Sequence, residues 1–212
     1  MNPNWAEENL QTIRTLMERS AVYRRALAPV MTFAGAVGTL TAAIGWVSRI
    51  DTETGFVTLW FCAAAVAVTG AFLFTRRQAL KDEEPFWSPP TRRVAQALAP
   101  FFAVGLFVSL LLYFDAKNAS GHDGTTVNPA MAGTWIFFYG CALHAAGFFM
   151  PRGIRWFGLL FIACVCGMLV LSDVQWLPCR LNANWLMGFF FGVLHLAYGG
   201  YLYLTEKKIN AA

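Results

Sequence analysis

The fold class of this chain is decided by the segment Phe101-Phe-Ala-Val-Gly-Leu-Phe-Val-Ser-Leu-Leu-Leu-Tyr113. It lies in a longer run, 94–114, that contains no Asp, Glu, Lys or Arg. As a helix, a run of this length crosses a hydrocarbon layer of roughly 30 Å. Its apolar residues do not alternate with polar ones, as they would in a strand of a membrane β-barrel. The segment therefore predicts a membrane-spanning helix.

The same pattern recurs along the whole chain. Further uncharged runs cover 26–47, 56–74, 131–149, 156–171 and 185–204. The 212 residues are 57% hydrophobic and 13% charged, whereas soluble domains carry about 25% charge. This composition excludes a disordered chain, a nucleic-acid-binding domain and an ordinary water-soluble enzyme. We expect an all-α protein, a bundle of six transmembrane helices over 26–204 with a short tail, 205–212.

The basic residues predict which way the bundle faces. Thirteen of the sixteen Lys and Arg residues lie in the N-terminal tail, in 75–93, in 150–155 and in the C-terminal tail. These four segments fall on one side of a six-span topology. Because basic residues accumulate on the cytoplasmic side, we expect both termini to be cytoplasmic.

The first 25 residues predict a cytoplasmic amphipathic helix that starts near Trp5, with Asn4 as its cap. Its apolar face is formed by Leu10, Ile13, Leu16 and Met17. Such a helix could lie on the membrane surface, dock on the bundle or bind a membrane or cytoplasmic protein. The first of these is the favoured interpretation.

Small residues at every fourth position predict which helix faces pack together, because helices in lipid associate through close backbone approach. Such stripes are formed by Ala34, Gly38 and Ala42, by Ala63, Ala67 and Ala71, and by Gly188 and Gly192.

Two histidines, His144 and His195, lie inside the predicted spans, and an ionisable residue there is a functional candidate by default. Glycines flank each at about one turn, which predicts a groove around each imidazole; they are Gly140, Gly147, Gly192 and Gly199. In one interpretation the pair holds a haem iron, another metal or a proton. In the favoured one, each imidazole hydrogen-bonds a neighbouring carbonyl or hydroxyl, with candidates in Tyr139, Ser109, Thr134 and Tyr198. No metal-ligand spacing occurs in the sequence, so no cofactor is expected, with haem as the alternative.

Three segments resemble an uncharacterised family of bacterial inner-membrane proteins with six spans. They are Asn9-Leu-Gln-Thr-Ile-Arg-Thr-Leu-Met-Glu-Arg-Ser20, Trp135-Ile-Phe-Phe-Tyr-Gly140 and Met187-Gly-Phe-Phe-Phe-Gly-Val-Leu-His195-Leu-Ala-Tyr-Gly199. The resemblance would cover nearly the whole chain. It implies a bacterial cytoplasmic membrane and places His195 in a recurring segment, but it implies no activity.

Three functions are compatible with these features. The spans contain no nucleophile with a base and no paired carboxylates, so no catalytic residue is expected. The leading hypothesis is a non-enzymatic sensor, scaffold or accessory subunit. The alternatives are a small-molecule carrier or substrate-binding membrane subunit of a transporter, and a haem-binding redox protein that uses His144 and His195.

Overall fold

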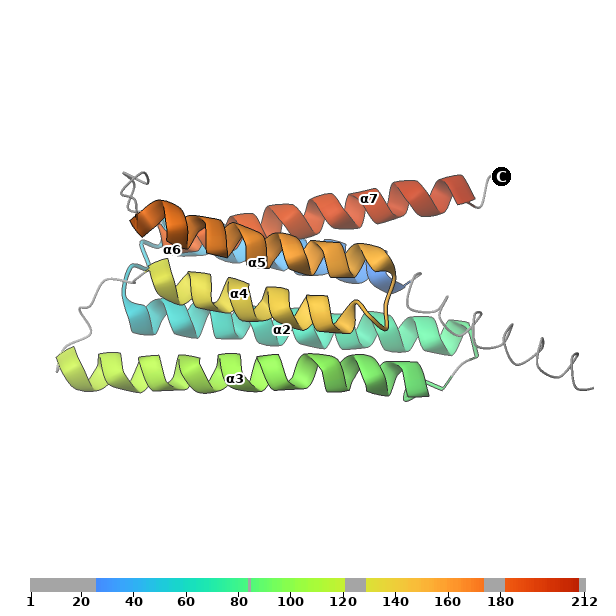
Figure 1. The fold of residues 1–212 in the computed structure, drawn as a ribbon, viewed down its shortest axis with the longest axis horizontal. Coiled ribbons are helices and arrows are strands. Elements are labelled where there is room, and N and C mark those ends of the chain that lie inside the picture. Colours follow the sequence, from blue (N-terminus) through green and yellow to red (C-terminus); the bar gives the residue numbers. More distant parts are fainter. Residues whose placement is uncertain (1–25, 84, 121–128, 174–181, 210–212) are drawn as a thin grey trace, which may run out of the picture.

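The structure is a computed structural model that describes residues 26–83, 85–120, 129–173 and 182–209. The N-terminal helix predicted over 1–25 lies outside these ranges. Within them the chain forms long helices that run back and forth along one axis (Figure 1).

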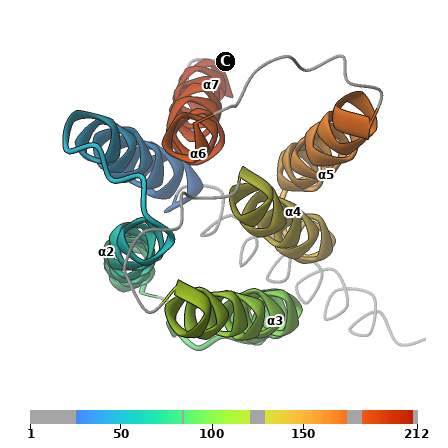
Figure 2. The same ribbon diagram turned by 90° about the vertical axis from the view of Figure 1, so that its left-hand side faces the viewer.

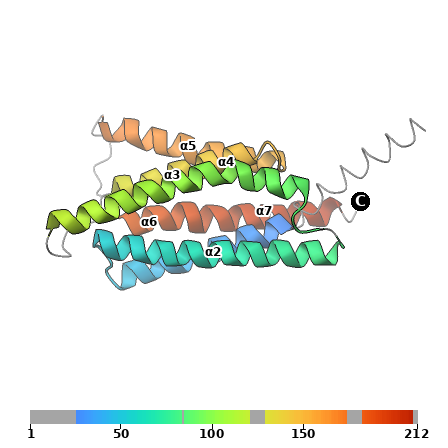
Figure 3. The same cartoon turned by 90° about the horizontal axis from the view of Figure 1, so that it is seen from below.

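The elements follow one another in the order expected for a helical bundle. They are a first helix, Ala26–Val47, then α2 (Glu53–Lys81), α3 (Pro89–Ser120), α4 (Pro129–Ala146), α5 (Arg152–Asp173), α6 (Ala183–Met187), the π-helix η1 (Gly188–Val193) and α7 (Leu194–Ile209). The last three form one continuous helix along the bundle (Figure 3). The prediction of an all-α fold is confirmed for the described residues.

In the part of the chain that the structure describes, five helices are long and apolar enough to cross a membrane, within Ala26–Val47, Glu53–Lys81, Thr91–Asp115, Arg152–Leu171 and Ala183–Thr205. The fourth predicted span corresponds to α4, which has 18 residues and is not among the five. Its sequence includes Tyr139 and His144, which lower its mean hydropathy below that of the five.

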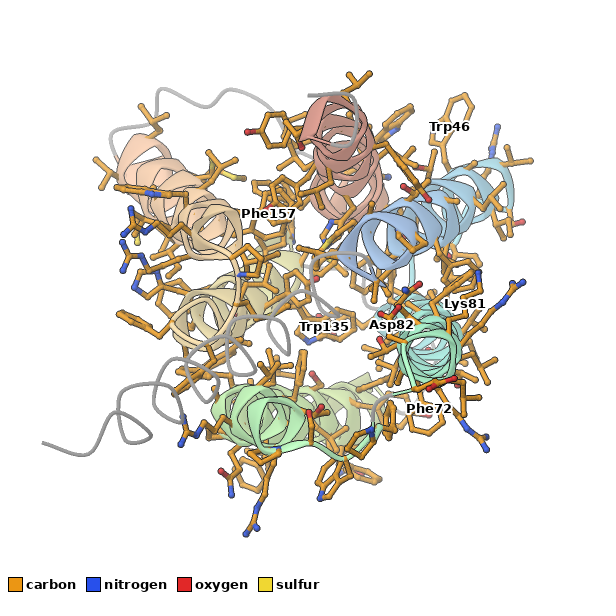
Figure 4. All side chains as sticks on the ribbon, turned by 90° about the vertical axis from the view of Figure 1, so that its right-hand side faces the viewer. Trp46, Phe72, Lys81, Asp82, Trp135 and Phe157 are labelled. Atoms are coloured by element: carbon orange, nitrogen blue, oxygen red, sulfur yellow. The ribbon has the colours of Figure 1, made fainter. Side chains whose placement is uncertain are left out.

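Large apolar side chains cover much of the outer surface. Trp46 and Phe72 are 57% and 48% exposed and point away from the bundle, whereas Trp135 and Phe157 point into it (Figure 4). In water such a surface would be unfavourable, whereas lipid chains would cover it. The fold is therefore compatible with a multi-pass helical membrane protein.

The helices do not begin and end at the same residues as the uncharged runs. The second predicted span, 56–74, lies within the longer α2, which begins at Glu53 because the Thr52 side chain accepts a hydrogen bond from the Gly55 backbone N–H at 3.3 Å. The fourth predicted span, 131–149, is wrong at its end, because α4 ends at Ala146. The chain turns after Ala146 and returns directly as α5, and a Cβ on Gly147 would lie 2.6 Å from the Arg155 backbone.

Seen along the axis, the first helix, α2, α3, α4 and the α6–α7 helix are arranged in a ring, and α5 lies outside it against α4 (Figure 2). The end of α7, the α2–α3 connection and the α4–α5 turn lie at one end (Figure 1). The topology is therefore up and down, with each helix antiparallel to the one before it.

Glycines bring the first helix against the last one. A Cβ on Gly38 would lie 2.6 Å from the backbone carbon of Phe191, and one on Gly192 would lie 2.6 Å from Oγ1 of Thr39. Gly188 packs directly on Ala42. The stripes predicted on these two helices are therefore confirmed at these positions, since a side chain would separate the backbones.

Candidate ligand cavity

A cavity of about 250 Å³ lies inside the ring, bounded by the first helix, α2, α3, α4 and the last helix. Most of its wall is formed by Ala, Val, Leu, Met, Phe and Gly side chains, including the predicted stripe residues Ala34, Ala63 and Ala67. Its polar side chains are those of Trp60, Ser109, Trp135, Tyr139 and His195. An apolar cavity with a few polar groups is the usual form of a small-molecule site.

The cavity opens sideways between α2 and α3. Val68 on α2 lines it and is 64% exposed, and Phe102 and Leu106 on α3 line it and are 45% and 49% exposed. All three lie near the middle of their helices. The mouth therefore faces the zone that hydrocarbon chains occupy around a membrane-spanning bundle.

Tyr139 and His195 form a hydrogen-bonded pair on the wall. The Tyr139 hydroxyl lies 2.7 Å from Nε2 of His195, and Nδ1 of His195 lies 2.8 Å from the carbonyl oxygen of Phe190. A carbonyl oxygen can only accept, so Nδ1 carries the hydrogen, and Nε2 of a neutral imidazole is then an acceptor. The Tyr139 hydroxyl donates to it. The imidazole is 1% exposed, and an apolar setting of this kind favours its neutral form.

The π-helix η1 explains how His195 reaches this carbonyl. Its backbone hydrogen bonds span five residues, as in the bond from the Leu194 N–H to the Phe189 carbonyl oxygen. The His195 side chain likewise reaches back five residues, to Phe190. The ring of Phe191 stacks on the imidazole with 6.0 Å between centroids. Single π-helical turns are frequent at functional sites, and this one ends two residues before the cavity histidine.

Two further hydrogen-bonded groups support the cavity. Nε1 of Trp135 donates to Oγ of Ser109, which in turn donates to the carbonyl oxygen of Gly105 at 2.6 Å. At one end, Nε1 of Trp60 donates to Oδ1 of Asn184 at 3.0 Å, and Nδ2 of Asn184 donates to the Ile50 carbonyl oxygen at 3.0 Å. These bonds fix the rings of both tryptophans.

His144 lies elsewhere. Its Nδ1 is 3.3 Å from the carbonyl oxygen of Arg155 on α5, and its ring meets Phe148 edge-on. It lines a second pocket, which also includes Cys141 and Ile162. The two histidines therefore do not face each other across one pocket. Each histidine does hydrogen-bond a carbonyl or hydroxyl group. Of the predicted candidates, Tyr139 is the partner of His195.

The flanking glycines do not form the predicted grooves around the imidazoles. A Cβ on Gly140 would lie 2.8 Å from Cβ of Phe161 on α5, and Gly147 is closed by Arg155 in the same way. A Cβ on Gly199 would lie 2.5 Å from Oγ1 of Thr32 on the first helix. At these glycines, as at Gly192, two helices approach each other closely. The neighbouring helix therefore occupies the space beside each glycine.

The sequence did not identify the cavity as a site. Its pattern predicts Ser109 only as a partner of a histidine, and it does not predict a role in a cavity for Trp60, Trp135 or Asn184. Of these residues, only Asn184 could have been identified from the sequence, because an amide at the edge of an apolar run must find hydrogen-bond partners when it is buried. Within the described ranges, no three His, Cys, Asp or Glu side chains lie close enough together to bind a metal ion.

Comparisons with protein-family models, with curated proteins and with solved structures give no match to this chain.

Proposed function

We propose that this chain is a six-span integral membrane protein that binds a small hydrophobic molecule taken from the bilayer, as a sensor or accessory subunit rather than an enzyme. The observation that carries the proposal is the apolar cavity of about 250 Å³ with its mouth between α2 and α3. This volume is near the lower end of ordinary small-molecule sites, which are roughly 300–1,000 Å³. It would hold a compact molecule or the end of a longer one.

The position of the mouth supports a lipid-soluble ligand. The exposed side chains around it are those of Val68, Phe102 and Leu106, all apolar. A water-soluble molecule would lose its hydration before reaching this opening, whereas one dissolved among lipid chains would have little to lose. The wall also offers no ionised side chain to bind a charged substrate. This favours binding over the transport of ions or charged metabolites.

In this proposal α4 is the sixth span. It contains no Asp, Glu, Lys or Arg, and it lies between α3 and α5 over its length (Figures 1 and 2). The positions of the basic residues support cytoplasmic termini. The assignment to the bacterial inner membrane depends on the resemblance of the short segments to that family. A role for residues 1–25 in binding a partner stays a prediction.

Filling the cavity tests the proposal. Gly105 lines it, and a Cβ there would find its nearest neighbour at 3.9 Å, so Gly105→Leu places a side chain in the cavity without meeting backbone. Gly200 has nothing within 4 Å of its Cβ position and does not line the cavity, so Gly200→Leu is the matched control. Thermal unfolding of the purified protein is measured with and without 1-dodecanol, dodecane and 2-dodecanone.

We expect at least one of these probes to raise the unfolding temperature of the wild type and of Gly200→Leu, because a ligand that binds the folded state stabilises it. Gly105→Leu should lose the response. Equal responses in all three proteins would mean that the probes act on the detergent or the outer surface, and no response in the wild type would refute the proposed function.

A further inference from the structure

The polar hydrogens in the cavity wall are all engaged within the protein. The indole hydrogen of Trp60 goes to Asn184, and that of Trp135 goes to Ser109. The hydroxyl hydrogen of Ser109 goes to the Gly105 carbonyl oxygen.

The Tyr139 and His195 pair follows the same rule. Nδ1–H of His195 is directed to the Phe190 carbonyl oxygen, which leaves Nε2 to accept the hydrogen of the Tyr139 hydroxyl. The opposite tautomer would place two lone pairs against each other at 2.8 Å, between Nδ1 and this carbonyl oxygen. Among the polar side chains that line the cavity, none therefore has a hydrogen left for a ligand.

Acceptor capacity does remain. An oxygen of a hydroxyl group has two lone pairs. Oγ of Ser109 uses one of them for Trp135, and no described partner donates to the Tyr139 oxygen. Both residues line the cavity. The wall can thus accept a hydrogen bond and cannot donate one without breaking a bond that it already makes.

We infer that the cavity selects a membrane-soluble molecule that carries a hydroxyl group over one that carries a carbonyl group. The hydroxyl hydrogen is accepted by Tyr139 or Ser109, while the apolar part fills the space between α2 and α3. The carbonyl oxygen of a ligand would find no free donor in the cavity wall, and it would lose any hydrogen bond that it made before it entered the cavity. A charged amine could also donate, but the apolar mouth disfavours its entry. This inference rests on the proposed function and specifies its ligand class.

Three probes of equal chain length test the selection. 1-Dodecanol has a donor and an acceptor, 2-dodecanone has an acceptor alone, and dodecane has neither. Affinity is read from the concentration dependence of the unfolding temperature, with Gly105→Leu as the control for action outside the cavity. We expect 1-dodecanol to bind about tenfold more tightly than 2-dodecanone, since one hydrogen bond contributes roughly this much. 2-Dodecanone should bind no more tightly than dodecane.

Two variants should let the cavity bind a carbonyl group, because each frees a donor in the wall. Ser109→Ala leaves the indole hydrogen of Trp135 without its acceptor, and His195→Leu does the same for the Tyr139 hydroxyl. In either variant the affinity for 2-dodecanone should rise above that for dodecane. Ser109→Ala is the smaller change, so it keeps the test decisive if His195→Leu fails to fold.

The outcomes distinguish the two proposals. Cavity-dependent binding of all three probes with equal affinity would refute the selection and leave the proposed function standing. Tighter binding of 2-dodecanone than of 1-dodecanol by the wild type would also refute the selection. Binding of none of the probes would refute the proposed function itself.

Discussion

The hydroxyl of Tyr139 on α4 donates to Nε2 of His195 on α7 over 2.7 Å, and it joins two helices across 56 residues of sequence. The same imidazole is fixed from its other side by the Phe190 carbonyl oxygen at 2.8 Å. Both ring nitrogens are therefore in use, and the pair forms one polar corner of an otherwise apolar cavity.

Removal of the Tyr139 hydroxyl should destabilise the bundle. In Tyr139→Phe, Nε2 of His195 loses its donor inside the protein, and we expect a loss of about 1 kcal/mol in the free energy of unfolding. Unfolding in mixed micelles with increasing SDS measures this. Tyr201→Phe is the control, because Tyr201 is 59% exposed and should change the stability little. Equal losses in both variants would show that the bond to His195 contributes nothing.

Asn184 should contribute more to the stability of the fold than its position at the start of a helix suggests. It is 2% exposed and joins Trp60 on α2 to the Ile50 carbonyl oxygen before that helix. Asn184→Ala leaves a donor and an acceptor unpaired, so we expect a loss of about 2–3 kcal/mol, seen as a lower unfolding temperature. Thr58→Ala removes a hydroxyl that is exposed and bonds only within its own helix, to Thr54. A similar loss for Thr58→Ala would contradict the proposed role of Asn184.

The first helix should not tolerate even a methyl group at Gly38. A Cβ there would press on the backbone of Phe191 and Gly192, which cannot move away without shifting η1. Gly38→Ala should cost about 1–3 kcal/mol, as overpacking does in well-packed cores. Gly167 on α5 has nothing within 4 Å of its Cβ position, so Gly167→Ala should be neutral or slightly stabilising. The opposite order in an unfolding series would show that this helix contact is loose.

Single cysteines test the orientation that the basic residues predict. Asp51 and Glu83 are exposed and lie in connections at opposite ends of the bundle. In a background without the native cysteines, an impermeant maleimide should label Asp51→Cys in intact bacterial cells producing the protein. It should label Glu83→Cys only after permeabilisation, because the more basic end faces the cytoplasm. The reverse pattern would place the termini outside.

The helical fold could be predicted from the sequence because it depends on a local requirement. Every backbone hydrogen bond in a hydrocarbon layer must be made within the protein, and an uncharged run of about 20 residues satisfies this as a helix. The glycine and alanine positions of the first and last helices were also predictable, since Gly38, Ala42, Gly188 and Gly192 recur at helical spacing. Helix ends were less predictable, as α4 shows: the uncharged run continues to 149, but the helix ends at Ala146 and Gly147 packs closely on Arg155 of α5, a contact that the length of the run does not reveal.

The uncharged runs thus predict long apolar helices, and His144 and His195 stand out as ionisable groups among them. What surrounds each histidine depends on how the helices pack. The glycines beside them are closed by neighbouring helices, His144 turns to a carbonyl on α5, and His195 meets Tyr139 beside a cavity bounded by five helices. Helical periodicity fixes which residues share a face, whereas the relative rotation of helices in a bundle depends on packing between segments far apart in sequence.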